Sequence, residues 1–166
     1  MEIMNTLTIP IQMRFGDIDS FGHANNVMQL QYFEDARIRL GEMTLEDAPG
    51  VPAGTTYREM VGDRLTVIGR QEVEYLQQMN YRTDPVEVEV WASHISKSSY
   101  VLNYRLQEQG GGTVFAIAQS TTVEVDAETG RPEPLGDEQR AFLEHFSGEP
   151  TAFKRRPSGT EGDEEG

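Results

Sequence analysis

The chain has 166 residues, no cysteine and a formal net charge of -14, from 14 basic and 28 acidic side chains. This length is typical of one domain that buries a sizeable core without disulfides, and the missing thiols exclude cysteine nucleophiles and cysteine-based zinc sites. A surface so acidic repels nucleic-acid phosphates, and every apolar stretch is too short for a membrane span, so neither nucleic acid nor membrane is an expected partner.

Alternating apolar and polar residues predict a strand over 7–15, the first element of the chain. Residues 26–42 contain no proline and end near a glycine, which favours a helix. This helix is apolar almost all round, as is usual for a helix enclosed by other elements. After a loop rich in proline and glycine over 44–54, we expect strands over 64–79, 85–99, 100–109 and 113–126, and a short helix over 136–146.

The connections between these strands are too short for the crossovers that parallel strands require, so the sheet should be antiparallel. With one long helix packed on it, the domain belongs to the α+β class. One sheet face would cover the helix, and a second copy of the protein could cover the other. We expect the domain to span 1–147, and residues 148–166, which end in a run of acidic residues, to form a disordered tail.

The segment richest in polar groups is "DIDSFGHANN", residues 17–26, between the first strand and the long helix. A calcium-binding EF-hand loop would need an oxygen ligand at its fifth position and a glutamate at its twelfth, which Phe21 and Met28 do not supply. The three histidines of the chain lack the spacing of a transition-metal site, so no metal is expected. An aspartate-based phosphotransferase would need a parallel sheet, and the GxSxG signature of serine hydrolases is missing from the sequence.

A strand-to-helix turn of this composition can serve acyl transfer. Gly22 lets the backbone bend sharply, and Asn26 is a favoured N-cap with Gln29 as its capping-box partner. The amides of a helix's first turn lack intrahelical acceptors and can stabilise the oxyanion that forms when a carbonyl is attacked. Asp19 stands just upstream, where its carboxylate could attack the carbonyl carbon or activate a water. The same residue types are also common as plain caps and turn residues, and this alternative stays open.

Four segments occur in a familiar order over residues 7–146: "FGDIDSFGHANNVMQLQYFEDAR", "VEYLQQMNYRTDPVEVEV", "ISKSSYVLNYRL" and "VEVDAETGRPEPLGDEQRAFL". Together they resemble the hotdog-fold thioesterases of the 4-hydroxybenzoyl-CoA thioesterase-like family. The resemblance implies the hotdog fold, a long antiparallel β-sheet wrapped around one central helix. It also implies a homo-oligomer, because members pair their sheets edge to edge as homodimers and some stack further into tetramers.

The function implied by this resemblance is that of an acyl-CoA thioesterase, a hydrolase that converts an acyl-CoA thioester to a carboxylic acid and free CoA without a cofactor. In this family the second aspartate of the turn, here Asp19, carries catalysis as general base or as nucleophile. The oxyanion donor is a backbone amide at the start of the central helix, near Asn26, and Asp17 supports the turn. The expected substrate-binding residues are His23, Asn25, Lys97, Ser98 and Ser99.

One departure from the family concerns coenzyme A. Members that hold its phosphates often carry clustered arginines and lysines before the segment equivalent to "KSS", whereas this chain offers Lys97 and at most His94. A lone exposed lysine contributes little, so we expect a pantetheine tunnel with a loosely held nucleotide, and the acidic surface disfavours acyl carrier protein. The alternative function is that of a non-hydrolytic acyl-CoA-binding hotdog protein. Because no signal-peptide pattern precedes the first strand, we expect the protein in the cytoplasm.

Overall fold

Residues 5–154 are described by a computed structural model, in which five strands form one antiparallel sheet in the order β1-β3-β4-β5-β2. The strands are β1 (Leu7–Ile11), β2 (Leu65–Tyr75), β3 (Val86–Ser93), β4 (Ser99–Glu108) and β5 (Val114–Val125). The helices are α1 (Asn26–Leu40), α2 (Tyr57–Val61) and α3 (Asp137–His145), with a 3-10 turn, η1 (Phe15–Asp17), before α1. The predicted antiparallel sheet with one long helix is therefore confirmed.

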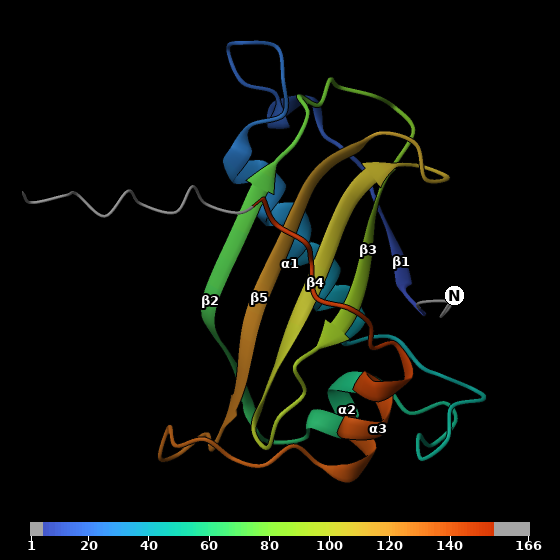
Figure 1. Ribbon diagram of the computed structural model, residues 1–166, viewed down its shortest axis with the longest axis vertical. Coiled ribbons are helices and arrows are strands. Elements are labelled where there is room, and N and C mark those ends of the chain that lie inside the picture. The colour runs from blue at the N-terminus through green and yellow to red at the C-terminus, as the bar shows by residue number, and fades with distance from the viewer. Residues whose placement is uncertain (1–4, 155–166) are drawn as a thin grey trace, which may run out of the picture.

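The sheet wraps around α1, which runs along its inner face (Figure 1). Val86, Val88 and Val90 of β3 are fully buried on that face, while the glutamates between them point to the other face. On α1 the residues that pack inward are Tyr32, Phe33, Ala36 and Leu40. Burial of this apolar face against the strands holds the helix in the sheet, since propensity alone stabilises a helix of this length only marginally.

The expectation that α1 is enclosed on all sides is wrong for the single chain. Val27 and Ile38 are 68% and 52% exposed, and they lie three turns apart on the same side of the helix. The sequence has apolar residues on two opposite sides of α1, and the sheet covers only the side that carries Tyr32, Phe33, Ala36 and Leu40. The second apolar side of α1 therefore faces outward, next to β2.

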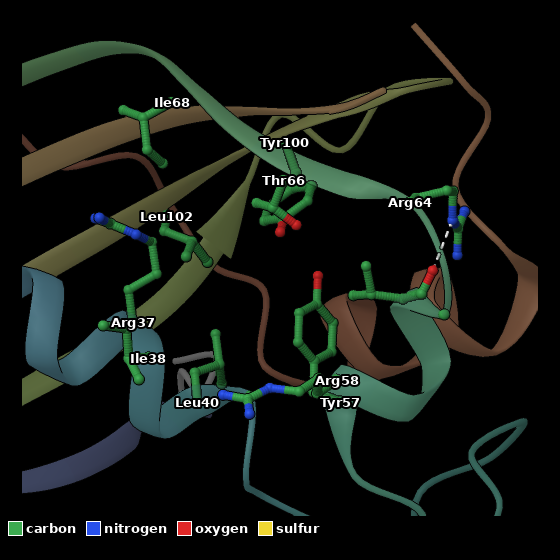
Figure 2. A pocket seen from close by; sticks show the side chains of 13 residues that line it. Arg37, Ile38, Leu40, Tyr57, Arg58, Arg64, Thr66, Ile68, Tyr100 and Leu102 are labelled. Carbon is green, nitrogen blue, oxygen red and sulfur yellow. Dashed lines mark hydrogen bonds between the residues drawn. The ribbon is translucent and has the colours of Figure 1, made fainter. Parts of the chain in front are cut away.

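Strand β2 forms one edge of the sheet and carries exposed apolar side chains along its length. Leu65 pairs with Val125 at one end of the strand, and Tyr75 pairs with Ala116 at the other. Leu65 is 52% exposed and Val67 is 45% exposed. Next to the Leu65 end, a cavity of about 330 Å³ opens between β2, α2 and the last turn of α1 (Figure 2).

Residues 146–154 cross the outer face of the sheet (Figure 1). The Trp91 indole N–H donates to the Glu149 carbonyl at 2.7 Å, and the Thr151 backbone N–H donates to Oδ1 of the buried Asn103 at 2.9 Å. The Lys154 backbone N–H donates to the Glu74 carboxylate at 3.0 Å. The outer face that we expected a second copy to cover is thus partly covered by the chain itself.

Most predicted elements agree with the structure to within a few residues, and α2 was not predicted. The strand expected over 85–99 ends at Ser93, because residues 94–98 form a bend with His94 at a positive φ of 46°. The domain limit at 147 stays a prediction: residues 148–154 make the contacts above, and residues 155–166 lie outside the described part of the chain. No helix within residues 5–154 is long and apolar enough to cross a membrane.

Deletion of residues 148–154 tests the role of this segment. A chain that ends at 147 should unfold with a free energy about 1–3 kcal/mol lower than one that ends at 154, because the buried Trp91 N–H loses its acceptor and Oδ1 of Asn103 loses the Thr151 donors and keeps only Gln119. Urea denaturation of the two chains measures the difference. Equal midpoints would show that the contacts across the outer face contribute nothing and that the domain ends at 147.

Candidate active site

The turn before α1 is closed by its own backbone. The Asp19 N–H donates to the His23 carbonyl at 2.9 Å, and the Gly22 N–H donates to the Asp19 carbonyl at 3.1 Å. Gly22 has a φ of +83°, a conformation that side chains with a Cβ adopt only with strain. The predicted sharp bend at this glycine is confirmed, and it brings Asp19 and His23 face to face across a small loop.

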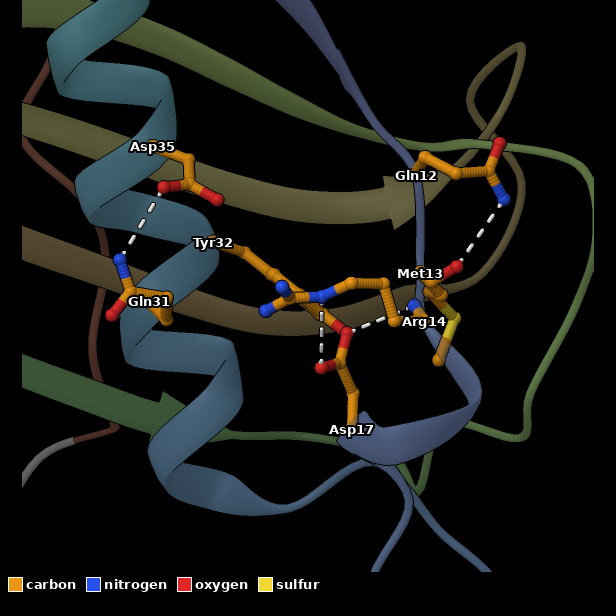
Figure 3. Close-up of polar contacts among 7 residues, drawn as sticks. All are labelled: Gln12, Met13, Arg14, Asp17, Gln31, Tyr32 and Asp35. Atoms are coloured by element: carbon orange, nitrogen blue, oxygen red, sulfur yellow. Dashed lines mark hydrogen bonds and ion pairs between the residues drawn. The ribbon is translucent and has the colours of Figure 1, made fainter.

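Asp17 fixes this turn to the helix (Figure 3). Its carboxylate is buried and accepts the Tyr32 hydroxyl at 2.7 Å and the Arg14 backbone N–H at 3.0 Å, with the Arg14 Nε atom 3.5 Å away. The Asp17 carbonyl accepts the Asn25 N–H at 2.9 Å. Burial and the bond to Asp17 raise the pKa of Tyr32 well above its usual range, so the phenol stays a donor. These contacts give Asp17 a structural part in the turn.

The Asp19 carboxylate is held by one of its two oxygens. Oδ1 accepts the backbone N–H groups of Phe21 at 2.9 Å and His23 at 3.4 Å. Among residues 5–154, no hydrogen bond reaches Oδ2, and the residue is only partly exposed. One oxygen thus fixes the orientation of the carboxylate, and the other remains able to accept a proton or attack a carbon.

The helix start differs in one respect from the prediction. Asn25, rather than Asn26, is the N-cap: its side-chain oxygen accepts the Val27 N–H at 2.9 Å, and its carbonyl accepts the Gln29 N–H. Asn26 is the first helical residue, and Gln29 has no capping-box role. Within the described part of the chain, the amides of Asn26 and Met28 have no acceptor. They are hydrogen-bond donors of the first turn for which the helix itself provides no acceptor.

Asp19 and the first turn of α1 line one cavity of about 290 Å³. Tyr75, at the end of β2, closes one side of it, and its hydroxyl donates to the Asn26 carbonyl at 3.1 Å. Burial raises the pKa of Tyr75, so this hydroxyl keeps its proton at neutral pH. Gln29 is 2% exposed and lines the same cavity, and its Oε1 atom has no partner among the described residues. Sequence reasoning missed the cavity positions of Tyr75 and Gln29, because no local pattern brings a strand end to a helix start.

The structure brings some of the predicted site residues together and separates others. Asp19, His23 and Asn26 line the cavity, and Asn25 stands beside it as the cap. The remaining candidates, Lys97, Ser98 and Ser99, lie at the other end of the sheet, where Ser99 pairs with Val123 and the Lys97 carbonyl accepts the Leu135 N–H. Nine residues of strand β2, roughly 30 Å, separate these two ends.

The arrangement suits attack on a carbonyl. Asp19 and Asn26, whose backbone amide has no acceptor among the described residues, line one cavity, and helix-end amides of this kind stabilise developing negative charge without reorganisation. No group of three or more metal-binding side chains occurs within residues 5–154.

Comparison with known proteins identifies the fold. A family model described as the thioesterase-like superfamily matches residues 13–143. The uncharacterized protein YsmA of Bacillus subtilis is 29% identical over 140 residues, which is 81% of this chain and 83% of YsmA.

Solved structures agree with this match. A predicted thioesterase from Bacillus stearothermophilus has 28% identity and a TM-score of 0.69, over 89% of this chain and 100% of that one. A thioesterase from Thermus thermophilus, solved in complex with coenzyme A and Zn, has 28% identity and a TM-score of 0.65. The match covers 91% of this chain and 100% of that one. The predicted hotdog fold is therefore confirmed.

A double-mutant cycle tests the contact between Asp17 and Tyr32. Asp17→Ala should lower the free energy of unfolding by about 2–4 kcal/mol, because it leaves the buried phenol without an acceptor. Adding Tyr32→Phe should recover part of that loss, with a coupling of about 1–3 kcal/mol between the two changes. Denaturant titration of the four proteins gives the values, and strict additivity would contradict a direct bond.

Proposed function

This chain belongs to the thioesterase-like superfamily, and on that basis we propose that it hydrolyses an acyl-CoA thioester to a carboxylic acid and free CoA. One observation carries the proposal. The partly buried Asp19 and Asn26, whose backbone amide has no acceptor among the described residues, line the same cavity. The relative from Thermus thermophilus that was solved with coenzyme A supports the choice of thioester.

In the proposed reaction the thioester carbon sits between Asp19 and the first turn of α1. Oδ2 of Asp19 either removes a proton from the attacking water or attacks the carbon itself and forms an anhydride that water then hydrolyses. The carbonyl oxygen becomes an oxyanion and accepts a hydrogen bond from the Asn26 amide. When the carbon–sulfur bond breaks, the electron pair leaves with the sulfur. In the general-base route the CoA thiolate takes the proton that Asp19 removed from water, and in the anhydride route it takes the proton released by the water that hydrolyses the anhydride.

We propose that the protein acts as a homodimer in which two β2 strands pair in antiparallel fashion. Strand β1, at the other edge, is short and contains Pro10, which has no N–H to donate to a neighbouring strand. Strand β2 is long and exposes Leu65 and Val67, the kind of edge that pairs with another chain. An antiparallel pair brings the Leu65 end of one β2 next to the Tyr75 end of the other.

This pairing would bring the separated candidates together. Lys97, Ser98 and Ser99 of one subunit lie at the Leu65 end of its sheet, which in the dimer approaches Asp19 of the partner. The CoA nucleotide would then contact Lys97 at the subunit boundary, while the pantetheine arm leads to Asp19. Because one exposed lysine binds phosphates weakly, the nucleotide should add little to affinity.

Asp19→Asn tests the reaction. It should keep the fold and reduce thioester hydrolysis about 100-fold or more, because the amide cannot serve as base or nucleophile. Release of thiol from a panel of acyl-CoAs, followed with a thiol-reactive dye, measures the rates, and Asp47→Asn in an exposed loop is the matched control. Unchanged turnover would remove Asp19 from the reaction. Thermal stabilisation of the unmodified protein by acyl-CoA without thiol release would instead support the non-hydrolytic binder.

Val67→Asp tests the dimer. A charge on the paired edge should give a folded monomer with little hydrolysis, because each site then lacks the partner's residues. Thr8→Asp, on the exposed edge strand β1, should leave the protein dimeric in solution and its rate of hydrolysis unchanged. Sedimentation measures the oligomeric state, and thiol release measures the rate of hydrolysis. A fully active monomer would show that one chain forms a complete active site.

A further inference from the structure

The side-chain amide of Gln29 is a buried polar group that the fold leaves without a partner. Gln29 is 2% exposed and lies three residues after Asn26, the first residue of α1. Its Oε1 atom is enclosed, and no donor among residues 5–154 reaches it. Its Nε2 atom donates to no acceptor in the same part of the chain, the Asp19 carboxylate included. The single chain therefore gains no hydrogen bond from this side chain.

Stability gives no reason for an amide at this position. A buried polar group without a partner costs free energy, and an apolar side chain of similar shape, such as methionine, would fill the space without that cost. Gln139 provides the contrast. Its Oε1 atom is also enclosed and unpaired, but its Nε2 atom donates to the Glu124 carboxylate at 2.9 Å and to the Tyr57 hydroxyl at 3.0 Å. Gln139 thus stabilises the fold, whereas Gln29 makes no such contact.

The position of Gln29 on the helix directs its amide toward the candidate active site. Side chains of an α-helix point back toward its N-terminus, and residues three apart lie on the same face. The Gln29 amide is therefore directed over the first turn, where the Asn26 N–H has no acceptor among the described residues. Gln29, Asn26 and Asp19 line the same cavity of about 290 Å³. The buried amide belongs to the site of the proposed reaction.

The two ends of the Gln29 amide differ in their access to this cavity. Oε1 is enclosed, whereas Nε2, which is also unbonded, keeps some exposed surface and is the end that meets the cavity. A side-chain amide nitrogen donates hydrogen bonds and accepts none. The cavity therefore combines one anionic group, Asp19, with two neutral donors, Gln29 Nε2 and the Asn26 N–H. An oxygen that gains negative charge is stabilised by such donors.

We propose that Gln29 is a catalytic residue whose Nε2 atom donates a hydrogen bond to the thioester carbonyl oxygen, beside the Asn26 amide. This bond strengthens as the oxygen becomes an oxyanion, so it stabilises the transition state more than the bound substrate. The proposal rests on the proposed thioesterase function and adds a side chain to its oxyanion site. Because an amide does not ionise, the donor is present at every pH at which Asp19 is charged.

Gln29→Met tests the proposal through opposite effects on activity and stability. It should lower kcat about 100-fold and change KM little, because the lost hydrogen bond acts mainly in the transition state. The urea midpoint should stay the same or rise, because an unpaired buried amide is replaced by an apolar side chain. Thiol release from the best acyl-CoA gives the kinetic constants. A fully active Gln29→Met protein would overturn the inference.

Gln139→Met is the matched control, since it makes the same change at a buried glutamine with structural hydrogen bonds. It should lower the urea midpoint, because Glu124 and Tyr57 lose their donor, and leave kcat per folded protein unchanged. The more stable of the two variants should thus be the less active. Loss of stability and activity together in Gln29→Met would instead indicate a structural role for Gln29 and contradict the proposal.

Gln29→Glu adds a pH dependence that a structural role would not produce. The introduced carboxyl opposes the oxyanion when it is ionised, and it donates a hydrogen bond when it is protonated. The rate of Gln29→Glu divided by that of Gln29→Met should therefore rise about tenfold as the pH falls from about 8 to about 5. Asp19 and His23 line the cavity in both proteins, so most of their own titration cancels in the ratio. A ratio independent of pH would contradict donation from position 29.

An infrared measurement tests the contact with the carbonyl directly. Asp19→Asn should bind an acyl-CoA but hydrolyse it slowly, so the band of an isotopically labelled thioester carbonyl can be recorded in the complex. A hydrogen bond lowers this frequency, because it draws negative charge onto the oxygen. Adding Gln29→Met to Asp19→Asn should move the band to higher frequency. The same frequency in both proteins would show that Gln29 does not touch the carbonyl, and would overturn the inference.

Failure of this inference is distinguishable from failure of the proposed function. Equal kcat values for the unmodified protein and Gln29→Met would overturn the role of Gln29 and leave the thioesterase intact. If the unmodified protein hydrolyses no acyl-CoA, the proposed function is wrong and the catalytic role of Gln29 is wrong with it.

Discussion

Burial of one side of α1 against the inner face of the sheet is the interaction on which the rest of the structure depends. It sets the position of both helix ends, and each end opens into a cavity. The first turn leaves amides without acceptors, as in any α-helix, and the packing of the helix against the sheet keeps them beside Asp19. Asp17 completes this arrangement: its bond to Tyr32 joins the turn to the second turn of α1, so Asp19 keeps a fixed position relative to the helix start.

Polar groups are buried at both ends of α1. Some of them have hydrogen-bond partners within the chain, and others have none among the described residues. Around Asp17 and Glu124 the donors and acceptors are matched, which offsets the cost of removing them from water. Other buried groups have no partner among the described residues, namely the side-chain oxygens of Gln29, Thr122 and Gln139. Gln29 faces the cavity of Asp19, and an unmatched buried amide beside a carboxylate is costly unless substrate or water satisfies it.

The exposed side of α1 and the edge strand β2 have a common explanation in the proposed dimer. Val27, Ile38, Leu65 and Val67 are apolar and exposed, and they lie on neighbouring elements. A second copy paired along β2 would remove much of this surface from water and would place two incomplete cavities side by side. Stability and substrate binding would then depend on the same contact, as expected for a site at a subunit boundary.

The sequence alone determined the local features of this protein. Short connections fixed an antiparallel sheet, the alternation of Val86, Val88 and Val90 with glutamates fixed the faces of β3, and the "DIDSFGHANN" pattern indicated the turn before α1. These follow from rules that act over a few residues. Tertiary structure decided the cap at Asn25, the closure of the cavity by Tyr75, the path of residues 146–154 and the separation of Lys97 from Asp19. Each of these joins residues far apart in the chain, or depends on where neighbouring elements stop the helix, and no local pattern carries that information.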